Sequence, residues 1–234
     1  MIRLGWNRLR GPLNHEQRAM WLQSSCRGVL SSLGIRYRVH GALPTRGLVV
    51  SNHLSYLDIL IYSAAMPCAF VSKTEINSWP YFGLAARAGG TLFIDRSSRA
   101  SAAAVAAEMA KRLQLPIPVL LFPEGTSTDG SRVLPFFSSL FQPAVAGGFP
   151  VTTAAVRYVI RGGVPESELC WFGEAPFLPH LWKALGTRGF SAELTFGEPR
   201  IFGDRRTAAL TTHEEIAVMR EIQGRATMGQ GPGL

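Results

Sequence analysis

Between residues 47 and 122, short apolar runs alternate with longer segments of helical periodicity. The runs are rich in aliphatic and aromatic residues and cover residues 48–51, 69–72, 91–94 and 117–122. The segments between them, 56–66, 79–88 and 100–115, are long enough to form helices. Strands that alternate with helices of roughly 10–15 residues are typical of a parallel sheet. We therefore expect an α/β fold with a largely parallel central sheet flanked by helices.

Outside this region the pattern is less regular. It predicts a helix at 14–33, a strand at 35–40, a helix at 136–146 that Pro143 breaks or kinks, a strand at 151–160, a short strand at 169–173, a short helix at 178–185 and a late strand at 192–196. The sequence Thr212-His213-Glu214-Glu215 fits a capping box, which would start a last helix that ends near Ala226. We assign residues 34–226 to one domain and 227–234 to a disordered tail.

Positive charge is concentrated near the N-terminus. Residues 1–40 contain seven arginines and one acid, Glu16, so this segment carries +6 of the net charge of +8. Trp6 and Trp21 lie in the same segment. A basic amphipathic helix with tryptophans is typical of an interfacial anchor on anionic lipid. We therefore interpret residues 1–33 as a membrane-associating segment that includes an interfacial amphipathic helix. The alternatives are a solvated helix and a nucleic-acid patch, although the chain has no motif of a nucleic-acid-binding module.

The composition favours a protein that works next to lipid. Hydrophobic residues make up 47% of the chain and the mean hydropathy is +0.12, yet no run reaches the roughly 20 apolar residues of a spanning helix. The N-terminus lacks the apolar region of a signal peptide, so we expect a peripheral or monotopic protein on the cytoplasmic face of the membrane. Cys26, Cys68 and Cys170 are too far apart to indicate a disulfide framework or a zinc site, and we expect no metal.

A candidate catalytic pair follows the first apolar run. His53 and Asp58 form an HxxxxD pattern, and a histidine backed by an aspartate is a general base for an alcohol. Positions five apart do not stack on one helix, so the two side chains meet only if the chain turns between them. Ser55 could be the N-cap that makes this turn. The alternative is a structural histidine that caps a helix.

Two further groups follow the other apolar runs. Phe122-Pro123-Glu124-Gly125-Thr126 ends in a glycine-centred turn, whose backbone N–H groups could bind an anion. Arg96 follows the run 91–94, and its guanidinium could hold a phosphate; it could instead pair with a surface acid such as Asp95. Lys73 could add positive charge over the same site or remain a solvated lysine.

In order and spacing, these blocks resemble the glycerolipid acyltransferases, the family that includes 1-acylglycerol-3-phosphate acyltransferase. HxxxxD is followed by GxxFxxR at 90–96 and by FPEGT at 122–126, and the resemblance covers about residues 34–156. It implies transfer of a fatty acyl group from acyl-CoA or acyl-carrier protein to the free hydroxyl of a lysophospholipid, in the first instance 1-acylglycerol-3-phosphate. The acyl donor is a co-substrate, and no cofactor is implied.

The resemblance also implies roles for individual residues. His53 and Asp58 would be catalytic, and the residues that bind substrate would be Lys73, Arg96, Glu124, Gly125 and Thr126. Glu124 could hold Arg96 or an acceptor hydroxyl. The expected partners are therefore a lysophospholipid, the acyl donor and a membrane surface, with no nucleic acid.

Two departures from the family pattern affect the acceptor. Ser127 stands where the family usually has an arginine, and a threonine replaces a proline of the fourth block at 150–153. The segments 171–173 and 179–182 resemble lyso-ornithine-lipid acyltransferases, so that lysolipid is the alternative acceptor. We interpret His180 as structural or interfacial.

Two other classes of function use the same residues differently. A hydrolase would use the His–Asp pair to activate water, but the chain has no GxSxG elbow and no cluster of metal ligands. A non-catalytic lipid-binding module would not need a base.

Overall fold

The computed structural model describes residues 13–73, 91–94, 99–187 and 190–229, and within them the chain forms a seven-stranded sheet. The strand order is β1-β7-β6-β2-β5-β3-β4. The strands are β1 (Arg36–His40), β2 (Leu48–Ser51), β3 (Ala69–Lys73), β4 (Leu92–Ile94), β5 (Val119–Leu121), β6 (Val151–Ile160) and β7 (Phe190–Phe196). Only the β6–β7 pair is antiparallel among these neighbours. The expected α/β fold with a largely parallel sheet is confirmed.

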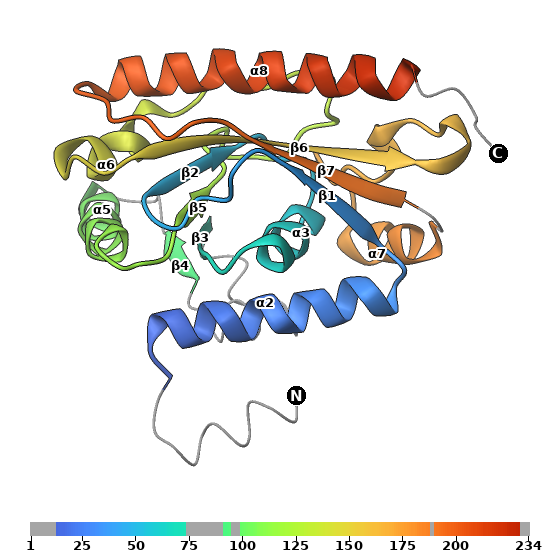
Figure 1. Ribbon diagram of the computed structural model, residues 1–234, viewed down its shortest axis with the longest axis horizontal. Helices are drawn as coiled ribbons and strands as arrows, with labels where there is room; N and C mark the ends of the chain where they lie inside the picture. Colours follow the sequence, from blue (N-terminus) through green and yellow to red (C-terminus); the bar gives the residue numbers. More distant parts are fainter. Residues whose placement is uncertain (1–12, 74–90, 95–98, 188–189, 230–234) are drawn as a thin grey trace.

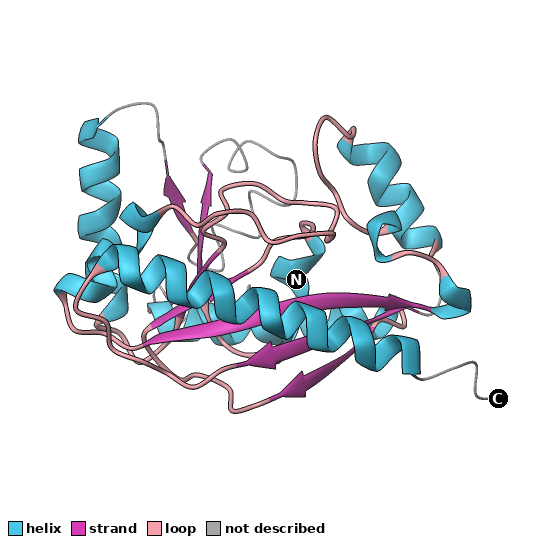
Figure 2. Cartoon of the chain, turned by 90° about the horizontal axis from the view of Figure 1, so that it is seen from above, coloured by secondary structure: helices cyan, strands magenta, loops and turns pink. Residues whose placement is uncertain are grey.

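Helices cover both faces of this sheet. They are α2 (His15–Ser32), α3 (Leu57–Ala65), α5 (Arg99–Leu113), α6 (Gln142–Ala146), α7 (Phe177–Gly186) and α8 (Arg205–Gly229). Figure 1 shows α8 above the sheet and α2, α3 and α7 below it. Seen from above, α8 runs along the long strand β6 (Figure 2).

The alternation of side chains along β2 divides the core into two clusters. Leu48 and Val50 pack with residues of α5, α6 and α8, whereas Val49 packs with residues of α2, α3 and α7. Because all four β2 residues are buried, both faces of this central strand are covered, as in parallel sheets generally. This packing on both faces holds the carboxyl end of β2 in place, at the carboxyl edge of the parallel strands.

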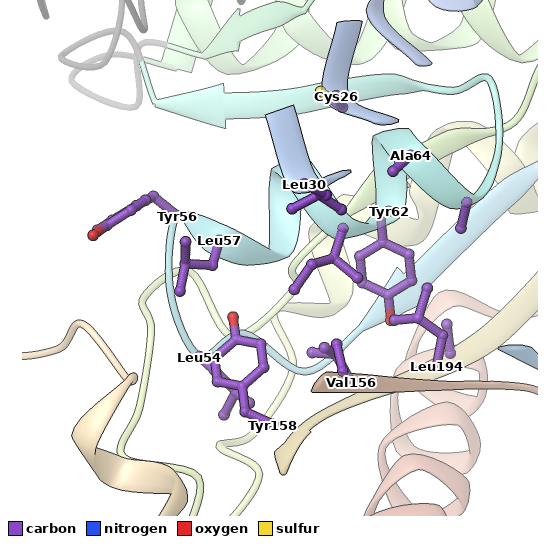
Figure 3. Close-up of a cluster of buried hydrophobic side chains, with 14 of the residues drawn as sticks. Cys26, Leu30, Leu54, Tyr56, Leu57, Tyr62, Ala64, Val156, Tyr158 and Leu194 are labelled. Atoms are coloured by element: carbon purple, nitrogen blue, oxygen red, sulfur yellow. The ribbon is translucent and has the colours of Figure 1, made fainter. Parts of the chain in front are cut away.

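Helix α2 belongs to this core. Asn14 and Gln17 form a capping box at its start. Its buried residues are Ala19, Leu22, Cys26 and Leu30. Their spacing of three and four places them on one stripe, and Figure 3 shows Cys26 and Leu30 on the side of α3. The predicted helix is present, and part of its apolar face is covered by the domain itself. Whether residues 1–33 also contact lipid stays a prediction.

Several local predictions need correction. The segment 169–173 is a loop. In the segment 136–146, a 3-10 turn (Ser138–Phe141) precedes α6, and Pro143 lies in the first turn of α6, where its missing N–H costs nothing.

The last helix starts earlier than the predicted capping box. It begins at Arg205, where the Asp204 carboxylate accepts the N–H of Thr207 at 2.8 Å, and it runs through Gly229. Thr212 is buried inside this helix, and its hydroxyl donates to the Ala208 carbonyl at 2.7 Å. The first three residues of the predicted tail, 227–229, are therefore helical. The predicted helix 79–88 lies outside the described residues.

The described helices include none with the length and hydropathy needed to cross a bilayer.

Candidate active site

The side chain of Asn52 fixes the turn after β2 to the neighbouring strand β6. Asn52 is buried, and its amide donates to the Val156 carbonyl at 3.1 Å and accepts the Val156 N–H at 2.9 Å. This pair of bonds continues the β2–β6 ladder by one residue after the strand ends. His53 therefore leaves the sheet at its carboxyl edge, where open α/β folds place their ligands.

His53 and Asp58 meet in the geometry that the HxxxxD spacing requires. His53 Nδ1 lies 2.8 Å from Asp58 Oδ2. The same oxygen accepts the backbone N–H groups of Leu54 at 2.7 Å and Ser55 at 3.1 Å. Asp58 lies in the first turn of α3 and is fully buried. The carboxylate itself thus closes the turn that joins the two residues.

Ser55 does not provide the predicted N-cap. Its hydroxyl is buried without a hydrogen-bond partner, whereas its carbonyl accepts the Asp58 N–H at 3.1 Å. The residue at the cap position is Tyr56, which makes no side-chain cap bond. The prediction of a turn was right, but the side chain that makes it is Asp58.

The second oxygen of Asp58 has its own donor, Tyr158. The Tyr158 hydroxyl donates to Asp58 Oδ1, and both side chains are almost completely buried. Figure 3 shows this hydroxyl pointing toward the first turn of α3. Burial, and then the negative charge of Asp58, raise the pKa of Tyr158 well above its ordinary value. Tyr158 therefore stays a neutral donor at any physiological pH.

The imidazole of His53 is held on its other side by an aromatic ring. It stacks on Phe122 with 4.0 Å between ring centroids and 12° between planes, and its side chain is 20% exposed. Because Nδ1 faces Asp58, Nε2 is the nitrogen that remains for a proton of a substrate. A histidine so oriented and still accessible is arranged as a general base.

Glu124 holds the two loops of the site together. Its Oε1 accepts the His53 N–H at 2.8 Å and its Oε2 accepts the Leu134 N–H at 2.7 Å. Burial raises the pKa of Glu124 to about 7, although both hydrogen bonds oppose this shift. Both oxygens accept backbone N–H groups, and the prediction that Glu124 also holds Arg96 or an acceptor hydroxyl stays a prediction, since Arg96 lies outside the described residues.

The rest of the 122–126 block turns over the histidine. Gly125 has φ +74°, a conformation that favours glycine, and its N–H donates to the Phe122 carbonyl at 3.2 Å. Thr126 is exposed. Thr128 N–H then donates to the His53 carbonyl at 2.9 Å. Gly125 thus shapes the loop, and Thr126 is open to a substrate.

The two predicted cations are described only in part. Lys73 is the last residue of β3 and is in register with Ile94 of β4. In the sheet, β5 lies between β3 and β2, the strand that leads to His53. Arg96 lies outside the described residues. Their roles in binding the acceptor stay predictions.

A buried ion pair, which the sequence did not indicate, supports this arrangement from the far side. Glu166 and Arg220 pair at 2.6 Å with about a tenth of each side chain exposed. Arg220 also donates to the carbonyls of Gly130 at 2.8 Å and Val156 at 2.9 Å, and Glu166 accepts the Tyr158 N–H at 2.6 Å. Because Arg220 is 54 residues from Glu166 and 64 from Val156 in sequence, no local pattern could have revealed these contacts.

Ser127 and Trp171 join the 122–134 loop to the segment before α7. The Ser127 hydroxyl donates to the Trp171 carbonyl, and the Trp171 N–H donates to the Leu54 carbonyl at 2.8 Å. Next to them, His180 Nδ1 lies 3.0 Å from the Tyr56 hydroxyl. His180 is buried, and burial lowers its pKa. This supports the structural interpretation of His180.

Comparison with known proteins agrees with this geometry. Residues 36–157 match a family model described as Acyltransferase. The lyso-ornithine lipid O-acyltransferase of Rhodobacter capsulatus is 36% identical over 211 residues, which are 88% of this chain and 74% of that protein. The 1-acyl-sn-glycerol-3-phosphate acyltransferase of Neisseria meningitidis is 39% identical over 140 residues, 58% of this chain and 55% of that protein.

A solved structure shares the fold. The crystal structure of the 1-acyl-sn-glycerophosphate (LPA) acyltransferase PlsC from Thermotoga maritima aligns with a TM-score of 0.67 at 19% identity, covering 96% of this chain and 89% of that one. The α/β arrangement around the His53–Asp58 turn is therefore one that another chain of distant sequence also adopts.

Proposed function

Because the chain belongs to the acyltransferase family, we propose that it moves a fatty acyl group from acyl-CoA or acyl-carrier protein to the free hydroxyl of a lysolipid. The observation that carries this proposal is the His53–Asp58 pair at the carboxyl edge of the sheet, with Nδ1 bound and Nε2 left for substrate.

The proposed reaction is a direct transfer. His53 Nε2 takes the proton of the acceptor hydroxyl as its oxygen attacks the thioester carbonyl, and Asp58 stabilises the imidazolium that forms. The tetrahedral intermediate then collapses, the C–S bond breaks, and the imidazolium returns its proton to the leaving thiolate. The products are the acylated lipid and the free thiol.

Burial of the described cysteines supports direct transfer. Cys26, Cys68 and Cys170 are each buried, and burial raises the pKa of the Cys26 thiol to about 11. A buried thiol of high pKa is a poor nucleophile at neutral pH, so we propose no acyl-enzyme on cysteine.

For the acceptor we propose lyso-ornithine lipid first and 1-acylglycerol-3-phosphate second. The sequence motifs favoured the second. The coverage of the relatives supports the reversed order, because four proteins named for lyso-ornithine lipid match 71–94% of this chain, whereas three named for 1-acyl-sn-glycerol-3-phosphate match 50–73%. The Ser127 hydroxyl also supports the revision, since it binds the Trp171 carbonyl where the family pattern would place a cation.

The experiment measures release of free thiol by purified protein from a long-chain acyl-CoA and, separately, from a long-chain acyl-carrier protein. It compares lyso-ornithine lipid, 1-acylglycerol-3-phosphate and no acceptor, and mass spectrometry identifies the lipid product. Release that depends on an acceptor, with formation of the diacyl product, supports the transferase. Thiol release without any acceptor would indicate a hydrolase, and no release with either donor would indicate a binding module.

We also propose that the protein works at the cytoplasmic face of a membrane, where a lysolipid and a water-soluble acyl donor can meet.

A further inference from the structure

Helix α7 has one buried face and one exposed apolar face. His180 and Ala184 are buried against the domain. On the other side, the exposed fractions are 63% for Leu178, 73% for Trp182 and 43% for Leu185. These three residues are spaced by four and three, so they form one stripe along the helix, which we call the α7 stripe.

The stripe bears no charge. The only ionisable residues of α7 are His180, which is buried, and Lys183, whose ammonium pairs with Glu168 at 2.5 Å. Phe172, in the loop before α7, is also exposed, at 42%. Leucine and tryptophan on such a face are typical of helices that lie in a membrane interface.

Helix α8 provides the contrast. Its exposed apolar residues Leu210, Val218 and Ile222 share one side of the helix with the exposed acids Glu214 and Glu221. Carboxylates among the apolar residues make that surface a solvated one, which an anionic bilayer would repel. The two helices lie on opposite faces of the sheet (Figure 1).

Helix α7 is coupled directly to the catalytic turn. The ring of Phe177 contacts that of Tyr56, with 5.1 Å between centroids, and His180 bonds to the Tyr56 hydroxyl. Tyr56 lies between His53 and Asp58 in the chain. The segment before α7 is tied to the same turn through the bond from Trp171 to Leu54. A surface that binds α7 therefore also lies close to the catalytic turn.

We propose that the α7 stripe docks on the surface of a lipid bilayer and holds the catalytic edge against it, with Trp182 in the interface. The inference rests on the proposed function, because an enzyme whose acceptor is a lysolipid must take it from a lipid phase. The predicted N-terminal anchor would be a separate contact: α2 also exposes apolar residues, Met20 and Val29, whereas α7 is the helix whose rings contact Tyr56 of the catalytic turn.

The test compares two triple variants of the full chain. The docking variant carries Leu178→Gln, Trp182→Gln and Leu185→Gln, and the matched control carries Leu210→Gln, Val218→Gln and Ile222→Gln on α8. Binding to vesicles of phosphatidylcholine with one fifth phosphatidylglycerol is measured by sedimentation, and thermal melting checks that both variants fold. We expect the docking variant to bind roughly tenfold or more weakly, and the control to bind as the wild type does.

Fluorescence locates the contact more closely. In vesicles with brominated acyl chains, part of the wild-type tryptophan fluorescence should be quenched. Trp182→Phe keeps an apolar side chain, so it should bind nearly as well but lose the part of the quenching that Trp182 contributes, while any quenching of Trp6 and Trp21 remains. Unchanged quenching would mean that Trp182 does not reach the lipid and would overturn the proposal.

Activity separates docking from chemistry. The docking variant should lose transfer to a long-chain lysolipid in vesicles, but not to a short-chain lysolipid dissolved below its micelle concentration. Equal vesicle binding by wild type and docking variant overturns the proposal, as does an equal loss in both variants. If the docking variant instead changes a wild-type dimer into a monomer without changing vesicle binding, the stripe binds a second copy. Absence of transfer by the wild type with every acceptor would refute the proposed function and leave vesicle binding to decide on docking.

Discussion

The hydroxyl of Tyr158 provides the sharpest test of how the catalytic pair is held. Tyr158→Phe removes one oxygen atom and leaves the ring in the core. Asp58 then keeps three donors on Oδ2, from His53 and from the backbone of Leu54 and Ser55, but loses the donor on Oδ1. Because Asp58 is fully buried, no water is at hand to replace the hydroxyl.

The size of the effect follows from that geometry. A hydrogen bond to a charged group contributes about 1.5–3 kcal/mol. The three remaining donors still hold the carboxylate, so we expect the lower end of this range in both the free energy of unfolding and kcat. That corresponds to roughly a tenfold loss of kcat. The KM for either substrate should change less than about twofold, since neither binds Tyr158 in the proposed mechanism.

The assay that distinguishes positioning from packing is the pH profile of kcat/KM. A carboxylate with one donor fewer attracts the proton of the catalytic pair more strongly, so the acid limb should move to higher pH in Tyr158→Phe. Tyr62→Phe is the matched control. Tyr62 is equally buried and its hydroxyl contacts Ser51 at 2.7 Å, so its loss should lower stability without moving the limb.

One result would refute the reasoning. If Tyr158→Phe and Tyr62→Phe lose the same stability, and both keep the wild-type kcat and the wild-type acid limb, Tyr158 only fills space next to Asp58.

Three further predictions concern the same site. His53→Ala should lower kcat/KM about 100- to 10,000-fold with an unchanged circular dichroism spectrum, and more than a tenth of the activity remaining would contradict its role as base. Burial raises the pKa of Glu124 from about 4.5 to about 7. The folded chain therefore keeps a proton that the unfolded chain loses, and the free energy of unfolding should fall by up to roughly 3 kcal/mol between these pH values. Urea denaturation at several pH values should show this slope in the wild type and a flatter one in Glu124→Gln. Arg220→Met should lower the free energy of unfolding by about 3–5 kcal/mol, because it leaves the Glu166 carboxylate buried without its partner. Adding Glu166→Gln should restore part of that loss, and a purely additive result would count against the pair.

Where a local pattern decides the structure, the sequence was sufficient. The strands β2 and β6 begin and end at the predicted residues, because both are rich in aliphatic and β-branched side chains, which favour a strand in a sheet covered on both sides. The order of the catalytic blocks likewise indicated the acyltransferase family and the edge of the sheet where His53 lies. These are properties of neighbouring residues and of their spacing.

Where more than one nearby residue could cap the start of a helix, the sequence pattern predicted the wrong one. Thr212-His213-Glu214-Glu215 fits a capping box, but Asp204, eight residues earlier, caps the helix instead. The longer α8 that results covers more of the sheet. Ser55 is a good N-cap residue, but the Asp58 carboxylate accepts two of the N–H groups of that turn. In both places the larger gain from packing or charge outweighed a local preference.

What the sequence determined by itself was the α/β fold, the strands near its centre and the histidine and aspartate of the candidate site. What only the tertiary structure decided was the environment of those residues: the Tyr158 hydroxyl on Asp58, the hydrogen bonds of Glu124 to backbone, the Arg220–Glu166 pair behind the site, and the exposure of the α7 stripe. The physical reason is that the sequence shows which face of a helix is apolar and which side chains can donate a hydrogen bond. It does not show which residues that face or that donor contacts. The partners of Asp58, His53 and Glu166 come from segments 54 to 100 residues away, and their positions follow only from the packing of the whole chain.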